Sequence, residues 1–225
     1  MIHFQKVCKS YDENIVLHNV NLKIEAGEFV SVIGASGAGK STVFHLLMGA
    51  DVPTSGTIKI DDIDLASLDT TALQLYRRRV GMVWQSFKLL PKKTVAENVA
   101  FALEAIDEDD PEILIKVDEI LEMVGLTNMS HKFPSQLSGG ERQRAAIARA
   151  LVHAPNIIIA DEPTGNLDPK TSLEIIKIFK EINKKGVTVI LATHDTHVVD
   201  AIHERVIEIR GGRVVRDDKK AKYSG

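Results

Sequence analysis

The sequence predicts an α/β fold built around a largely parallel sheet. Short apolar runs, typical of buried strands, alternate with longer segments whose apolar residues recur at helical spacing. A glycine-rich turn joins one buried run to a helix, and a later run is almost wholly apolar, as a strand covered on both faces must be. Strand, helix and strand in this order indicate a βαβ crossover.

The first half of the chain supplies three expected strands and one helix. The β-branched run Phe29–Ile33 predicts a buried strand, and a helix is expected at Ser41–Gly49 after the glycine-rich turn. The helix residues available for burial are Val43, Phe44, Leu46 and Leu47. Shorter strands are expected at Thr57–Ile60, after a Pro-Thr-Ser-Gly turn, and at Val80–Trp84.

The second half repeats the alternation of strand and helix. A buried strand is expected at Asn156–Ala160, and the next at Val187–Ala192. The helix between them is expected to begin at the N-cap Asp168, with Pro169 in the first position, and to end at Lys185-Gly186. Its buried stripe is expected to be Leu173, Ile176, Phe179 and Ile182.

The middle of the chain, from Thr94 to about Leu151, has a helical pattern with a stop expected near Gly125. Apolar residues recur there at helical spacing at Ile113, Val117, Ile120, Leu121 and Val124. We therefore expect one domain over 1–225, with a core lobe at about 1–85 and 152–216 and an inserted helical lobe at about 86–151. A loose polar tail is expected at 217–225.

Composition restricts the possible functions. The chain has 225 residues, of which 44% are hydrophobic, and a net charge of −3, which argues against a general nucleic-acid binder. The single cysteine, Cys8, allows no internal disulfide. No apolar run is long enough to span a bilayer, and Met1–Lys6 does not resemble a signal peptide. A cytoplasmic location is expected, with any membrane contact made through a partner.

A phosphate-binding loop follows the first buried strand. Gly34–Ser41 matches the pattern G-x-x-x-x-G-K-[ST], between a strand and a helix as that motif requires. Its backbone N–H groups and the helix N-terminus favour phosphate, Lys40 supplies positive charge, and the Ser41 hydroxyl is suited to Mg²⁺. The expected nucleotide-binding residues here are Gly34, Ala35, Ser36, Gly37, Ala38, Gly39, Lys40, Ser41 and Thr42.

Two carboxylates end the strand at Asn156–Ala160. Asp161 is placed to hold Mg²⁺ through its water shell, and Glu162 to polarise a water for attack on the γ-phosphate. A solvated turn is the alternative for this segment taken alone, since Pro163-Thr164-Gly165 follows. The phosphate-binding loop favours the catalytic interpretation.

A second glycine-rich helix start lies at Ser138-Gly139-Gly140-Glu141. Ser138 and Glu141 have capping-box spacing. Adjacent glycines each cost roughly 1 kcal/mol in a helix against alanine, so bare backbone indicates that an anion approaches closely. The cap and the anion site are compatible.

At these residues the chain resembles the ABC ATPase family, whose signature is Leu-Ser-Gly-Gly-Gln or a near variant. Tyr11 matches the aromatic residue that stacks on adenine, Gln85 the glutamine that reaches Mg²⁺ and the attacking water, and His194 the histidine that contacts the γ-phosphate. Gly165–Asp168 matches the loop that crosses the dimer interface. Taken singly, each has a structural alternative: a strand-edge aromatic, a polar strand end, a core histidine and a helix cap. All of them occur together in the order found in the family, which favours the functional interpretation.

The resemblance implies a P-loop NTPase (RecA-like) core with an N-terminal antiparallel β lobe and an inserted helical lobe. It implies an ATP hydrolase with Glu162, His194 and Gln85 as catalytic residues, and ATP and Mg²⁺ as ligands. The expected residues around Mg²⁺ are Ser41, Gln85 and Asp161. It further implies a head-to-tail homodimer in which Ser138, Gly139, Gly140 and Glu141 bind the γ-phosphate held by the other subunit, with Asp168 in the dimer loop.

Within this family, Asp161–Asp168 resembles the branch of the FtsE-type cell-division, lipoprotein-release and macrolide-efflux ATPases. Phe87–Pro91, Thr94–Leu103 and Val214–Asp217 look most like the FtsE type. That resemblance implies a membrane partner of the FtsX type at the cytoplasmic face of the cell membrane, and a role in cell division and control of cell-wall hydrolysis. The alternatives are a lipoprotein or macrolide exporter and, more remotely, a soluble ATPase acting on nucleic acid or ribosomes.

The segment Ser86–Pro91 is unusually apolar for a loop between two lobes. Phe87, Leu89 and Leu90 could lie buried within the helical lobe. The functional interpretation places them in a groove that receives a cytoplasmic helix of the membrane partner.

Overall fold

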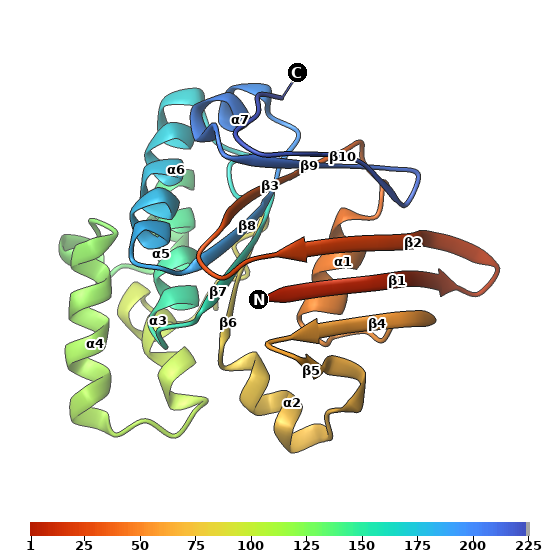
Figure 1. The fold of residues 1–225 in the computed structure, drawn as a ribbon. Helices are drawn as coiled ribbons and strands as arrows, with labels where there is room; N and C mark the ends of the chain where they lie inside the picture. The colour runs from red at the N-terminus through yellow and green to blue at the C-terminus, as the bar shows by residue number, and fades with distance from the viewer. Residues whose placement is uncertain (224–225) are drawn as a thin grey trace.

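The structure is a computed structural model that describes residues 1–223. Its larger sheet has six strands in the order β10-β9-β3-β8-β7-β6 (Figure 1). These are β3 (Phe29–Ile33), β6 (Val80–Trp84), β7 (Ile157–Asp161), β8 (Thr188–Ala192), β9 (Arg205–Arg210) and β10 (Arg213–Asp218). Within this sheet β6, β7, β8, β3 and β9 pair in parallel, and β10 pairs antiparallel with β9. The predicted parallel sheet is confirmed, with β7 and β8 each starting one residue later than expected.

The N-terminal part forms a second, four-stranded antiparallel sheet in the order β2-β1-β4-β5. Its strands are β1 (Ile2–Tyr11), β2 (Asn14–Ile24), β4 (Ser55–Ile60) and β5 (Ile63–Asp64). Helix α1 (Lys40–Leu47) shares a hydrophobic cluster with both sheets, to which it contributes the fully buried Phe44 and Leu47. The antiparallel lobe implied by the family resemblance is therefore present.

Side chains of the parallel strands alternate between two hydrophobic clusters, because successive residues of a strand point to opposite faces. Ile157 and Ile159 of β7 lie in the cluster shared with α1, whereas Ile158 and Ala160 lie in the cluster on the other face. Since both faces are covered, the strand is apolar at nearly every position.

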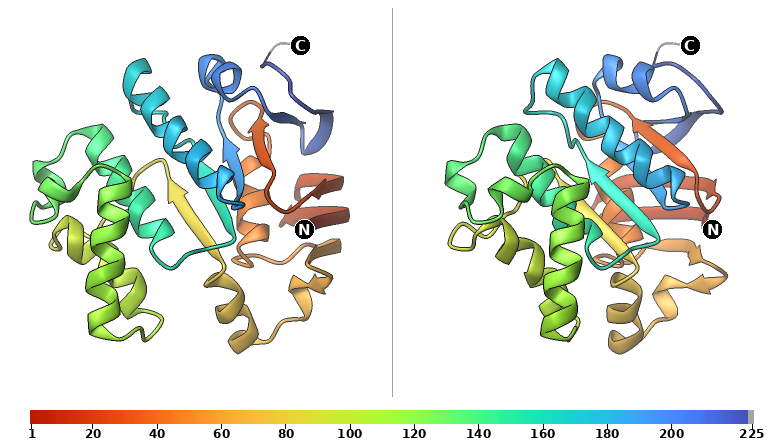
Figure 2. Two further views of the ribbon diagram at one scale, coloured as in Figure 1. Left: turned by 60° about the vertical axis from the view of Figure 1, so that its left-hand side comes forward. Right: turned by 90° about the vertical axis from the view of Figure 1, so that its left-hand side faces the viewer.

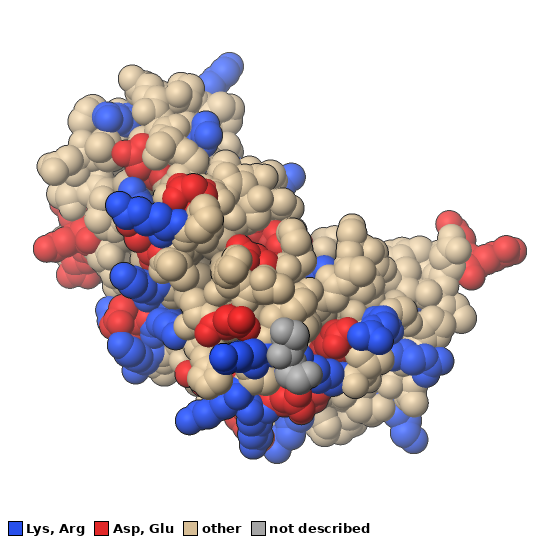
Figure 3. All heavy atoms as spheres, turned by 90° about the horizontal axis from the view of Figure 1, so that it is seen from above, with Lys and Arg blue, Asp and Glu red and all other residues tan. Residues whose placement is uncertain are grey.

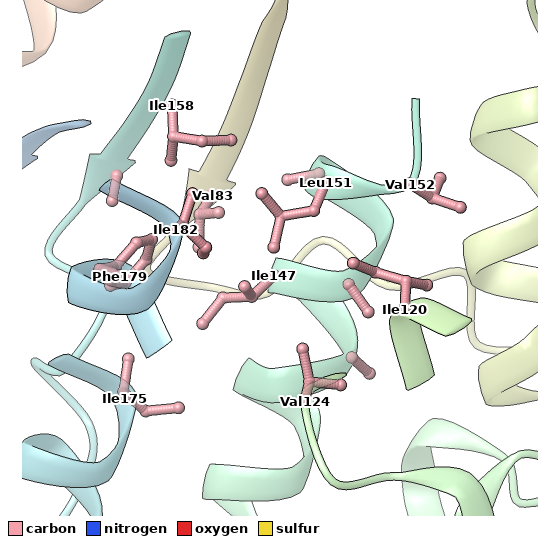
Figure 4. Close-up of a cluster of buried hydrophobic side chains, with 14 of the residues drawn as sticks. Val83, Ile120, Val124, Ile147, Leu151, Val152, Ile158, Ile175, Phe179 and Ile182 are labelled. Carbon is pink, nitrogen blue, oxygen red and sulfur yellow. The ribbon is translucent and has the colours of Figure 1, made fainter. Parts of the chain in front are cut away.

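The other face is covered by the middle of the chain, where α3 (Val95–Glu104), α4 (Asp110–Met123) and α5 (Gly139–Leu151) lie on the side opposite the N-terminal sheet (Figure 2). Figure 4 shows Ile147 and Leu151 of α5 between the sheet residues Val83 and Ile158 and the α4-side residues Ile120 and Val124. All the apolar residues expected at helical spacing here are buried: Ile113, Val117, Ile120, Leu121 and Val124. The lobe boundaries at 85/86 and 151/152 stay a prediction.

Helix α6 (Pro169–Lys184) begins as predicted, with Asp168 as N-cap. The prediction that Leu173 is buried is wrong, because this side chain is 42% exposed. The buried stripe passes through Ser172, Ile175, Ile176, Phe179 and Ile182 instead. The first buried position of the helix is the polar Ser172, so the pattern of apolar residues alone did not show which face is buried.

The loose tail expected from residue 217 also needs correction. Asp217 and Asp218 belong to β10, and Asp217 forms an ion pair of 2.7 Å with Arg205. Further on, the Arg216 guanidinium donates to the backbone oxygen of Tyr223 at 2.7 Å, and Tyr223 packs beside α7 (Thr196–Ile202). The chain is therefore fixed up to Tyr223, and residues 224–225 of the expected tail lie outside the described residues.

Helix α2 (Thr70–Arg77) lies between β5 and β6 in the chain. Within residues 1–223, no helix has the length and apolarity needed to cross a membrane. Seen from above, basic and acidic side chains are interspersed over the surface (Figure 3), in agreement with the small net charge of −3.

Candidate nucleotide site

The glycine-rich loop connects the end of β3 to the start of α1, at the carboxyl edge of the parallel sheet. Gly34 has φ +149°, and a Cβ there would lie 2.2 Å from the backbone oxygen of Ile209. Only glycine therefore fits where the loop leaves the strand, because the next strand passes too close. Gly39 is the last residue before α1, so the helix N-terminus faces the loop.

Lys40 is the first residue of α1 and curls back over this loop. Its Nζ donates to the backbone oxygens of Gly34 at 2.7 Å and Ala35 at 3.2 Å. The side chain is buried at 8% exposure. A single ammonium charge is thereby fixed beside the backbone N–H groups of the loop, an arrangement suited to phosphate oxygens.

A pocket of about 790 Å³ opens at this loop. Its lining comprises Val16, Ala35, Ser36, Gly37, Ala38, Gly39, Lys40, Ser41, Thr42, Gln85, Asp161, Glu162 and His194. Residues up to 178 positions apart in the chain thus line one pocket. Of the expected nucleotide-binding residues, Gly34 and Tyr11 are not among the described lining residues, and Val16 was not expected. Val16 is a half-buried aliphatic residue of β2, and no sequence motif distinguishes it from other strand residues.

Asp161 ends β7 directly across from α1. The Ser41 hydroxyl donates to Asp161 Oδ2 at 3.2 Å. Burial raises the pKa of Asp161, the neighbouring Glu162 raises it further, and the hydrogen bond from Ser41 acts in the opposite direction. A hydroxyl and a partly desolvated carboxylate side by side form the oxygen-rich environment that Mg²⁺ prefers.

Glu162 follows in a left-handed conformation, with φ +47°. His194 Nδ1 lies 2.9 Å from Glu162 Oε1, so its N–H donates to the carboxylate. The Glu162 side chain is only 14% exposed, and among residues 1–223 its other oxygen, Oε2, has no hydrogen-bond partner. Glu162 lines the pocket, and the unpartnered oxygen of its carboxylate is closed off from solvent in this structure.

Gln85 comes directly after β6 and is exposed at the pocket. A Cβ added to Gly165 would lie 3.0 Å from Gln85 Nε2. The loop that precedes α6 therefore touches this glutamine, and glycine leaves room for the contact.

Tyr11, at the end of β1, does not line the pocket among the described residues. Its hydroxyl donates to Asp51 Oδ2 at 2.6 Å, and Lys9 Nζ lies 4.7 Å from the ring centroid. The hydrogen bond to Asp51, followed by burial, raises the Tyr11 pKa. This network fixes the ring, and its stacking on adenine stays a prediction.

Ser138 caps α5 as predicted. Glu141 N donates to Ser138 Oγ at 3.3 Å, and Ser138 N donates to Glu141 Oε2 at 2.7 Å. The backbone hydrogen bond from Ser138 lowers the Glu141 pKa. In the described part of the chain neither residue lines the pocket, so one subunit does not bring this helix end to its own loop.

Packing within the chain itself explains why glycine stands at the two positions that follow Ser138. A Cβ at Gly140 would lie 2.5 Å from Thr171 Cγ2, and one at Gly139 would lie 3.2 Å from Leu167 Cδ2. Thr171 stands in the first turn of α6, where its backbone N–H donates to Asp168 at 3.0 Å. Close packing of α5 against the start of α6 therefore requires Gly140, independently of the anion expected at this helix end.

A compensating pair of variants tests this packing. Gly140→Ala is expected to lower the melting temperature by several degrees, because overpacking costs about 1–3 kcal/mol. Thr171→Ser removes the opposing methyl group and keeps the hydroxyl that bonds Asp168. The double variant is therefore expected to regain most of the lost stability in thermal unfolding. Equal melting temperatures for Gly140→Ala and the parent would contradict the packing role.

The apolar segment after Gln85 fits neither of its two interpretations, burial in the helical lobe or an exposed groove, completely. Phe87, Leu89 and Leu90 are all half-buried, and Leu89 packs against the cluster formed with the helical lobe. The segment is neither wholly core nor a freely exposed groove.

The family profile described as "ABC transporter" matches residues 17–165. "Cell division ATP-binding protein FtsE" of Bacillus subtilis is 47% identical over 99% of this chain and 98% of that protein. "Methionine import ATP-binding protein MetN" of Caulobacter vibrioides is 44% identical over 96% of this chain and 66% of that protein. A solved dimeric ATP-binding cassette, in a post-hydrolysis state bound to ADP and Pi, has a TM-score of 0.87 at 40% identity, covering 99% of this chain and 100% of that one.

The match of the profile, the identity to these relatives over nearly the whole chain and the arrangement of the site agree. The chain belongs to the ABC transporter family and is an ATP-binding, ATP-hydrolysing subunit.

Proposed function

We propose that this ATPase is of the FtsE type and drives an integral membrane partner of the FtsX type in cell division and in the control of cell-wall hydrolysis. The observation that carries the proposal is the similarity to FtsE proteins from three bacterial genera, at 45–47% identity over 99% of this chain. The chain would then act at the cytoplasmic face of the cell membrane, without nucleic acid.

The phosphates of ATP would lie on the loop, with Lys40 beside the β- and γ-phosphates. Ser41, Asp161 and Gln85 would hold Mg²⁺, because all three residues line the pocket and carry side-chain oxygens, and Ser41 already donates to Asp161 at 3.2 Å. Bound Mg²⁺ supplies charge that offsets the negative charge of the phosphates.

Glu162 would orient and polarise the attacking water with its carboxylate, after a small rotation that exposes Oε2, the oxygen that His194 does not contact. His194 would keep the carboxylate in position through its 2.9 Å contact with Oε1, and it also lines the pocket wall. This arrangement follows the general form of a base held by a second group.

The site would be completed by a second copy of the chain. Ser138, Gly139, Gly140 and Glu141 lie outside the pocket of their own subunit, and a helix N-terminus attracts phosphate. A head-to-tail dimer would bring this helix end to the partner's γ-phosphate, with Asp168 in the loop at the interface. The related cassette described as dimeric supports this proposal.

Co-purification with candidate membrane partners tests the proposal. The Glu162→Gln variant and the parent would each be co-expressed with three membrane proteins of the same organism: one of the FtsX type, a methionine-importer subunit and a lipoprotein- or macrolide-exporter subunit. We expect retention on the FtsX-type protein alone, strongest for Glu162→Gln with ATP. Retention on another partner instead would assign the ATPase to that transporter.

A further inference from the structure

A strained turn follows Gln85. Phe87 and Lys88 both have left-handed backbones, with φ +60° and +51°. Phe87 N donates to Trp84 O at 3.1 Å, and Lys88 N donates to Ser86 O at 2.6 Å. Residues with a side chain avoid this conformation, and two in succession persist only where the surroundings enforce them.

Arg149 holds these two residues in the left-handed conformation. Its Nη1 donates to Lys88 O at 2.7 Å, and its Nη2 donates to Phe87 O at 3.0 Å. A planar guanidinium thus binds the two carbonyls of the strained residues at once, a geometry that lysine cannot reproduce. The Arg142 guanidinium lies 5.5 Å from the Phe87 ring centroid and holds the side chain of the same turn.

Both arginines belong to α5, the helix capped by Ser138. The far end of the segment is fixed separately, because the buried Asn98 accepts from Leu90 N at 2.7 Å and donates to Leu90 O at 3.1 Å. Gln85, two residues before Phe87, is thereby the side chain that joins the nucleotide pocket to a turn held by α5.

We infer that Arg149 is a positioning residue for hydrolysis, which holds the turn Phe87–Lys88 in its left-handed form and so keeps Gln85 directed into the nucleotide pocket. Through this contact, movement of the helix that begins at Ser138 would be passed by the turn to Gln85, two residues before Phe87. The inference rests on the proposed role of Gln85 in hydrolysis.

Arg149→Met keeps an apolar stem and removes both hydrogen bonds. We expect kcat to fall about 10- to 100-fold, as for a misplaced catalytic group, with ATP affinity within about twofold of the parent. Arg149→Lys retains the charge, and its kcat is expected to lie between those of the parent and of Arg149→Met. This variant also tests the inference if Arg149→Met does not fold.

Rescue by glycine separates positioning from general stability. Lys88 is exposed, and among the described residues its side chain makes no hydrogen bond or ion pair, so Lys88→Gly chiefly relieves the left-handed strain. The double variant Lys88→Gly/Arg149→Met should recover severalfold in kcat. The matched control Lys92→Gly/Arg149→Met, with glycine at an exposed position of the same loop that lacks a positive φ, should recover nothing.

Hydrogen exchange of residues 84–90 gives a readout that does not depend on activity. Arg149→Met should speed exchange of the backbone amide of residue 88. In the double variant Lys88→Gly/Arg149→Met, exchange of the amide at the same position should be slower again. Unchanged kcat in Arg149→Met, or equal recovery with either glycine, would overturn the inference. Gln85→Ala is measured alongside: if it hydrolyses ATP normally, the proposed role of Gln85 fails, and exchange alone then decides whether Arg149 fixes the turn.

Discussion

Glu162→Gln is expected to bind ATP as the parent does and to hydrolyse it about 10²–10⁴-fold more slowly, the usual loss for a missing general base. The change keeps the size of the side chain and its contact with His194, and it removes the negative charge of a carboxylate that lines the pocket. ATP affinity should persist, because Lys40 and the loop are untouched. Single-turnover hydrolysis and equilibrium ATP binding measure the two effects separately.

The dimer should accumulate in this variant, since ATP stays bound. Size-exclusion chromatography with ATP and Mg²⁺ should show it, and removal of either ligand should return the monomer. Asp195→Asn is a matched control, because Asp195 neighbours His194, caps α7 and does not line the pocket among the described residues. Asparagine caps helices about as well as aspartate, so turnover should barely change. A Glu162→Gln variant with parental turnover would remove Glu162 from the mechanism.

The part of the site that sequence predicted is the part that lies at the ends of parallel strands. The loop after β3, the carboxylates at the end of β7, Gln85 after β6 and His194 after β8 converge because the carboxyl ends of such strands share one edge. The loop and the two carboxylates were expected from their place after buried strands, whereas Gln85 and His194 were expected only from the family resemblance.

What the sequence missed depends on contacts between distant elements. Val16 lines the pocket only because the antiparallel sheet lies against α1, and Asp51 fixes Tyr11 across 40 positions of the chain. Gly140 is required by a methyl group on another helix, and a motif alone could not reveal that. The exposed Leu173 shows the same limit, since hydrophobicity does not tell which side of a helix a neighbour covers.

Lys40→Ala and Ser138→Arg are both expected to abolish most hydrolysis, for different reasons. Lys40→Ala removes a charge from the subunit's own loop, and loss of a charged hydrogen bond weakens ATP binding by about 10- to 100-fold. Ser138→Arg leaves that loop intact, so the isolated subunit should bind ATP within about twofold of the parent. The bulky side chain then blocks the facing phosphate and prevents a dimer of two such subunits. Ser138→Ala is the control that loses the cap, about 1 kcal/mol, without adding bulk.

Mixing the two inactive variants in equal amounts gives the decisive measurement. In a mixed dimer one site combines Lys40→Ala with Ser138→Arg, and the other combines the parental Lys40 of one subunit with the parental Ser138 of its partner. If the subunits pair at random, half of all pairs are mixed and each mixed pair carries one complete site in two, so up to about a quarter of the parental rate should return. If both residues served a site within one chain, every subunit in the mixture would stay defective and no activity would return.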